Sequence, residues 1–204
     1  KPLARTIGET RELLLAARRH DVITQMGNQG HAGEGLRLAR EWVQAGLIGT
    51  VREVHVWTRK MEVGPYKSTR KERPAPGETP PGTLDWNLWN GPAPARPYSA
   101  EYAPRRWRNW WDFGCGALGD IGCHTMDAPF YALDLGAPYS VQADCGPFND
   151  ETFPDWAVIT YEFPARGARP AVRLTWYDGG KLPPRPRELE EGRAFEERYG
   201  YYLQ

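Results

Sequence analysis

The first 60 residues alternate between helical and extended patterns of apolar side chains. Thr6 and Glu9 form a capping-box pattern, and the apolar stripe behind them predicts a helix that ends near His20. Residues 22–26 form a short apolar run typical of a strand. A glycine-rich turn, a second helix that ends before Gly46 and an alternating strand follow at residues 27–31, 36–43 and 51–58. This order of elements indicates an α/β chain.

Between Lys60 and Arg108 this periodicity disappears. Prolines recur from position 65 to position 104, and they exclude long helices and central strands. Tryptophan and tyrosine side chains are nevertheless scattered through the segment, whereas disordered segments are poor in aromatic residues. We therefore expect a long ordered loop, and such loops in compact domains are commonly functional.

A second periodic region follows the loop. Glycines between Gly114 and Gly119 lead into a predicted helix over residues 117–135, kinked at Pro129. The last stretch, residues 187–204, shows no apolar face, and we expect it to fray or to dock weakly. Between the two, the pattern predicts strands at residues 139–145, 156–163 and 171–176.

Composition changes this picture mainly by exclusion. The formal net charge is zero, which removes the basic surface expected of a protein that binds nucleic acid or an anionic membrane. No apolar run reaches the roughly 18 residues that a membrane span needs, and no signal peptide opens the sequence. Three cysteines without a Cys-x-x-Cys spacing favour a reducing compartment, so we expect a cytoplasmic protein.

Aromatic residues are abundant for so polar a chain. They make up 12% of it, while its mean hydropathy is −0.66. Aromatic rings stack well on the apolar faces of sugar rings, which makes a carbohydrate ligand a reasonable expectation. The alternative is a core with additional aromatic plugs in the loops.

Candidate chemistry is concentrated in the helix predicted over residues 117–135. Asp120, His124 and Asp127 have i, i+4 and i+7 spacing, which places their side chains along one face of a regular helix. Carboxylates on both sides of an imidazole raise its basicity and fix its tautomer, or they form part of a metal site. We take these three as candidate catalytic residues. The alternative is a hydrogen-bonded core histidine with aspartates that cap backbone groups.

Residues near this helix are candidates for binding a substrate. Tyr66, Lys67 and Arg70 lie in the proline-rich loop and suit sugar hydroxyls or carboxylates, although they could equally be exposed loop residues. Trp110 and Trp111 adjoin the helix, and we expect these two rings to line a pocket.

The stretch Gly116-Ala-Leu-Gly-Asp-Ile-Gly-Cys-His-Thr-Met-Asp127 resembles the signature of the Gfo/Idh/MocA oxidoreductases. Lys1-Pro2 is similar to the end of that family's Glu-Lys-Pro motif, and residues 26–31 resemble a segment of a bacterial branch. The resemblance extends from Lys1 to about Pro184. It implies an α/β fold of the α+β type: an open mixed, mostly antiparallel sheet with helices on one face. We expect residues 1–204 to form a single substrate domain.

The resemblance also implies roles for residues. In such enzymes the residues that correspond to Lys1, Asp120 and His124 are catalytic, with the histidine as acid or base at a sugar hydroxyl. The Rossmann domain that precedes this domain would need a strand, a Gly-x-Gly-x-x-Gly turn opening a helix, and an acidic residue about 20 positions later. We find no stretch that meets all three requirements; the glycines of residues 30–35, for example, stand in the wrong order. We therefore expect no NAD(P) site within this chain, and no fixed position for Lys1.

Finally, the resemblance suggests that the turn at residues 27–31 faces the start of the helix, where His31, Asp120 and His124 could meet. Two histidines and a carboxylate form a common catalytic set for Zn²⁺ or Mn²⁺. Such a metal could activate water or polarise a glycosidic oxygen, with Asp127 or Glu62 transferring a proton. This favours a metal-dependent glycoside hydrolase.

Three alternatives stay open. The chain could be the substrate domain of an NAD(P)-dependent sugar or polyol oxidoreductase, or a non-catalytic sugar-binding fragment. His31 could be a turn histidine bonded to backbone. As to assembly, a sheet with helices on one side leaves its other face uncovered, and burial against a second copy is the usual remedy. We therefore expect a homodimer or a larger homo-oligomer.

Overall fold

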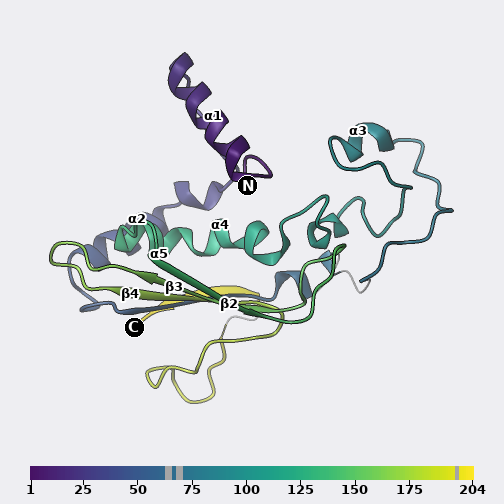
Figure 1. Cartoon of the computed structure of the whole chain (residues 1–204). Coiled ribbons are helices and arrows are strands. Elements are labelled where there is room, and N and C mark those ends of the chain that lie inside the picture. The colour runs from purple at the N-terminus through teal and green to yellow at the C-terminus, as the bar shows by residue number, and fades with distance from the viewer. Residues whose placement is uncertain (63–65, 68–70, 196–197) are drawn as a thin grey trace.

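The chain folds around one open sheet covered by helices on one side (Figure 1). The computed structural model describes residues 1–62, 66–67, 71–195 and 198–204. Within them, the strands lie in the order β2-β3-β4-β1-β5, with β1 and β4 parallel and the other neighbours antiparallel. This is the fold class predicted from the sequence. The strands are β1 (Glu53–Thr58), β2 (Ser140–Cys145), β3 (Ala157–Phe163), β4 (Val172–Tyr177) and β5 (Tyr199–Leu203).

The helices precede and follow β1 along the chain. Helices α2, α4 and α5 form the layer on the sheet, and α2 packs against α5 (Figure 1). The α-helices are α1 (Ile7–His20), α2 (Glu34–Gln44), α3 (Trp86–Asn90), α4 (Cys123–Thr125) and α5 (Asp127–Leu133). Shorter helical turns are η1 (Gln29–Ala32), η2 (Lys60–Glu62), η4 (Arg106–Asn109) and the π-helical η5 (Leu118–Gly122).

The core lies between the sheet and this helical layer. Val54 and Val56 of β1 stand in register with Leu174 and Trp176 of β4, so their side chains point to the same side, where all four are fully buried. They pack against Ile121 and against half-buried side chains of the helices that follow it. Removal of apolar surface from water, worth about 25 cal/mol per Å², stabilises this contact. The core thereby fixes the helical layer that carries the candidate site.

The face of the sheet opposite the helices is partly covered by the chain itself, whereas the sequence predicted an uncovered face. Figure 1 shows the segment between β4 and β5 running below the sheet. There the Phe195 ring packs 4.8 Å from Trp57 and 5.9 Å from Tyr202, whose hydroxyl donates to the Pro184 carbonyl. The chain itself thus covers part of the face on which the homodimer prediction rested, and that assembly stays a prediction.

The structure differs from the sequence prediction at two segments, because a segment becomes a strand only where another strand lies beside it and can pair with it. Residues 22–26 are extended but form no strand, since no described strand lies beside them, and Ile23 is fully exposed. Residues 199–203 do not fray: they form β5, which pairs antiparallel with β1.

The capping box of α1 is confirmed, with Thr6 and Glu9 each accepting a backbone N–H of the other. Nevertheless α1 projects away from the helical layer, and none of its residues is buried (Figure 1). Within the described residues, no helix combines the length and apolar character needed to cross a bilayer.

Asp178 ties the end of β4 to the start of β3, and it gives folding a distinctive pH dependence. Its carboxylate accepts the backbone N–H of Ala157 at 2.6 Å and the indole N–H of Trp176 at 2.8 Å. Burial raises the pKa of Asp178 to about 6, despite these donors. Because the folded pKa exceeds the unfolded one, this group stabilises the fold fully below pH about 4, and its contribution is lost as the pH rises through 6.

We therefore expect the free energy of unfolding, relative to that of Asp178→Asn, to fall by about 2 kcal/mol between pH 4 and pH 7. Urea denaturation of both proteins at each pH measures this difference, and the subtraction removes the contributions of the other titrating groups. A pH-independent difference would contradict the prediction.

Candidate functional site

Asp120 is the centre of the candidate site. It lies in the π-helical turn η5 and is 5% exposed. Lys1 Nζ donates to its Oδ1 at 2.6 Å and to its carbonyl at 2.7 Å, and Arg108 Nε donates to its Oδ2 at 3.1 Å. Burial alone would raise the pKa of Asp120, but the Lys1 hydrogen bond and the charges of Arg108 and Lys1 outweigh it and lower the pKa. Asp120 is therefore ionised, and Lys1, contrary to expectation, has a defined position.

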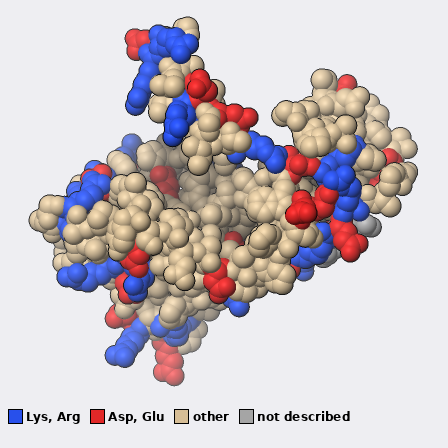
Figure 2. Space-filling view, in the orientation of Figure 1, with Lys and Arg blue, Asp and Glu red and all other residues tan. Residues whose placement is uncertain are grey.

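His124 follows one turn later, in α4. Burial lowers its pKa, and the nearby charges of Lys1 and Lys60 lower it further, against the opposing effect of Asp120. A histidine with a lowered pKa is neutral at pH 7 and can accept a proton. Lys1 contacts Asp120, and the charges of both act on His124. We refer to these three residues as the acid–base group. Figure 2 shows the surface hollowed on this side, beneath α1.

Asp127 contacts His31. Both of its carboxylate oxygens lie 2.9 Å from His31 Nδ1, and the His31 ring stands edge-on to Tyr131 at 5.1 Å between centroids. The π turn η5 interrupts the regular spacing from which a common face of Asp120, His124 and Asp127 was expected, because its i→i+5 bonding changes the number of residues per turn. That common face stays a prediction.

The predicted metal set is not assembled. Among the described residues, no group of three or more histidine, cysteine, aspartate or glutamate side chains is placed to hold a metal ion. Asp120 offers its oxygens to an ammonium and a guanidinium, and His31 faces Asp127. The set of His31, Asp120 and His124 thus lacks support in this geometry.

The predicted substrate-binding residues divide into two groups. Tyr66 and Lys67 line a cavity of about 510 Å³, whereas Arg70 lies outside the described residues. Trp110 is completely buried, its indole N–H donates to the Glu101 carbonyl, and its ring packs edge-on against Tyr102. The Trp111 ring packs against Phe153, and its N–H binds the Asn149 carbonyl.

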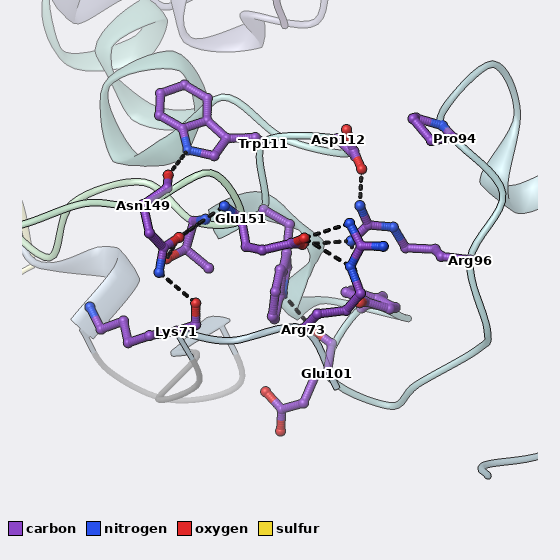
Figure 3. A network of polar contacts seen from close by, with 12 residues as sticks. Lys71, Arg73, Pro94, Arg96, Glu101, Trp111, Asp112, Asn149 and Glu151 are labelled. Atoms are coloured by element: carbon purple, nitrogen blue, oxygen red, sulfur yellow. Dashed lines mark hydrogen bonds and ion pairs between the residues drawn. The ribbon is translucent and has the colours of Figure 1, made fainter. Parts of the chain in front are cut away.

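A polar network, shown in Figure 3, holds the long loop in place. Glu151 accepts Arg73 Nη2 at 2.5 Å and Arg96 Nη1 at 3.1 Å, and Arg96 also pairs with Asp112. Asn149 donates to the Lys71 carbonyl from the same side. Through Glu151, Arg73 and Arg96 connect the described part of the loop to the segment between β2 and β3. This supports an ordered loop over the described residues.

Two cations that sequence reasoning did not assign to the site lie around Tyr66. Lys60 Nζ is 5.2 Å and Arg108 Cζ is 4.7 Å from the centre of the Tyr66 ring. Lys60 lies two residues after the end of β1. Its position at the end of a predicted strand is the sequence signal that could have marked it as a candidate site residue. Arg108 lies only a few residues before the glycines of the helix motif.

The glycine spacing of a dinucleotide site does occur once, at Gly114, Gly116 and Gly119, which the sequence analysis passed over. Here it does not fit such a site. The 3-10 turn η4 precedes it in place of a strand, and the π turn η5 follows it. A Cβ at Gly114 would overlap the backbone of Arg108, and one at Gly119 would overlap the side chain of Cys115. These glycines allow close packing within the chain, and the stretch does not form a dinucleotide-binding turn.

Comparison with known proteins agrees with this fold. Residues 36–169 match the C-terminal α/β domain of the Gfo/Idh/MocA oxidoreductase family. The match covers more than half of the sequence, and the chain belongs to this family. A search of curated protein sequences gave no match.

Two crystal structures of super-repressor mutants of Gal80p from Saccharomyces cerevisiae are similar in fold. One has a TM-score of 0.58 at 16% identity over 99% of this chain, and the other a TM-score of 0.55 at 15% identity over 88%. The matched regions make up 45% and 41% of those proteins, so this chain spans less than half their length.

Proposed function

We propose that this chain is the substrate domain of a sugar or polyol oxidoreductase and carries its proton-transfer groups. One observation supports this above all: Asp120 is ionised between Lys1 and Arg108, one turn from a neutral His124. An oxidised hydroxyl must lose a proton, and a neutral imidazole beside a fixed ammonium can take it.

Each residue has a separate task in this proposal. Lys1 donates a hydrogen bond to the substrate oxygen and stabilises the negative charge that develops on it. Asp120 holds the Lys1 ammonium through two contacts of 2.6 and 2.7 Å. His124 accepts the hydroxyl proton. The hydride acceptor is the dinucleotide typical of the family, for which the described residues of this chain offer no cradle.

The metal-dependent hydrolase has less support. Its three ligands are engaged separately, and the family match is to an oxidoreductase domain. The non-catalytic sugar-binding fragment differs from our proposal in one measurable property, the dependence of binding on the protonation of His124.

We expect the 204-residue chain to bind at least one member of a panel of hexoses and polyols, measured by calorimetry or ligand-observed NMR. Affinity should fall as the pH drops below the lowered pKa of His124, because the imidazolium can no longer accept a hydroxyl hydrogen. His124→Gln should bind more weakly at pH 7.5, and its affinity should not change with pH over this range.

Asp134→Asn is the matched control, because Asp134 is bound by Arg166 and Arg169 on another part of the surface. It should keep the affinity and the pH profile. Binding without a contribution of His124 to the pH profile would favour a non-catalytic sugar-binding domain. Failure of the whole panel would overturn the proposal.

A further inference from the structure

The acid–base group carries an excess of positive charge. Lys1, Lys60 and Arg108 surround Asp120 and His124, and the charges of Lys1 and Lys60 act on both of these groups. Among the described carboxylates, only Asp120 forms an ion pair with any of the three cations. With His124 neutral, three positive charges therefore meet one negative charge.

This imbalance is local and does not reflect a basic protein. The formal net charge of the chain is zero. In the network around Arg96 (Figure 3), by comparison, each carboxylate pairs with two arginines: Asp112 with Arg5 and Arg96, and Glu151 with Arg73 and Arg96. An uncompensated cation cluster in a partly buried site costs free energy unless an anion occupies it.

Two of the cations have free donor capacity. Arg108 uses Nε for Asp120 and Nη1 for the Arg105 carbonyl, while its Nη2 has no hydrogen-bond partner among the described residues. Lys60 contacts the Tyr66 ring with its ammonium, and no described carboxylate is paired with it. Both groups lie against the same ring, at 5.2 and 4.7 Å from its centre.

A cavity of about 510 Å³ is lined by Tyr66, the ring that both cations contact, although neither cation is itself part of the cavity wall. The charged side chains of the lining are three cations and three carboxylates: Arg59, Lys67, Lys71, Glu62, Asp155 and Asp178. This volume lies within the range of small-molecule sites, and its polar lining suits a polyhydroxyl ligand.

We propose that the substrate is an anionic sugar, whose carboxylate or phosphate binds Lys60 and Arg108 while its hydroxylated body occupies the cavity behind Tyr66. This rests on the proposed function and specifies its substrate class. It assigns Lys60 the role of a specificity residue, distinct from Lys1, which stabilises the substrate oxygen, and from His124, which accepts the proton.

The test compares matched pairs of ligands on the 204-residue chain at pH 7.5 and low salt. The pairs are glucose with glucuronate and galactose with galacturonate, together with the two hexose 6-phosphates. We expect the anionic member of at least one pair to bind about tenfold more tightly than the neutral sugar, with a preference that shrinks as salt is added. The uronates and the phosphates distinguish the two sources of negative charge.

Lys60→Met should abolish this preference while the neutral sugar still binds, and Lys60→Arg should restore it. Arg18→Met removes one positive charge from the exposed last turn of α1 and should leave the preference intact. Equal affinities within every pair would overturn this inference and leave the proposed function standing, whereas no binding of any sugar would overturn both. Acetate or inorganic phosphate binding as tightly as the anionic sugar, or NAD⁺ displacing it with the same sensitivity to Lys60→Met, would also overturn the inference.

Discussion

Replacement of Arg96 by methionine is expected to lower the free energy of unfolding by about 3–5 kcal/mol. The Arg96 side chain is only 3% exposed, and it pairs with both Asp112 and Glu151. Its Nη1 also donates to the Tyr102 hydroxyl at 3.3 Å. The variant leaves two carboxylates without this counter-charge in a poorly hydrated position. Urea denaturation measures the loss, and limited proteolysis should show cleavage within residues 71–113.

Arg73→Met is the control for this prediction. Arg73 pairs with the same Glu151 at 2.5 Å, but its side chain is 55% exposed. Exposed ion pairs contribute less than about 1 kcal/mol, so this variant should be nearly as stable as the original chain. Similar losses in the two variants would show that burial is not what makes Arg96 important.

Asp120→Asn is expected to have the second-largest effect, on binding and on folding together. The amide cannot neutralise Lys1 and Arg108, which then repel one another across a buried position. Because the two cations are partly exposed, the expected loss of stability is about 2 kcal/mol, less than for a fully buried pair. Sugar affinity should fall about a hundredfold, since Lys1 loses the anchor that positions its ammonium.

Calorimetry and urea denaturation of the same preparation separate the two losses. Asp134→Asn again provides the comparison, because Asp134 also bridges two cations but is about half exposed. It should lose less than about 1 kcal/mol of stability. Undiminished sugar binding by Asp120→Asn would remove Asp120 from the site.

The strands were predictable where one face of the sheet is buried by the chain's own helices. Val54 and Val56, or Leu174 and Trp176, alternate with more polar positions, and this alternation is visible in the sequence. Residues 22–26 carry as strong an apolar signal, yet none of the described strands lies beside them. Residues 199–203 carry a weak signal and still form a strand, since β1 offers them an open edge. Strand formation depends on the partner as well as on the pattern.

The motif singles out Asp120 and His124, and their catalytic role stays a prediction. The side chains that contact Asp120 could not be predicted from the motif. The expected common face of Asp120, His124 and Asp127 assumes 3.6 residues per turn, which the π turn does not keep. No rule of spacing indicates that Lys1, 119 positions away, reaches Asp120. Contacts of this kind arise from the fold as a whole.

The position of α1 leaves an apolar helix uncovered close to Lys1 along the chain. Its apolar side chains, among them Ile7, Leu13 and Leu14, are exposed along a helix that no described element covers. Five residues separate Lys1 from Ile7, the first residue of α1, and they span at most about 22 Å. A partner that covers α1 therefore lies within that length of chain from the ammonium that contacts Asp120.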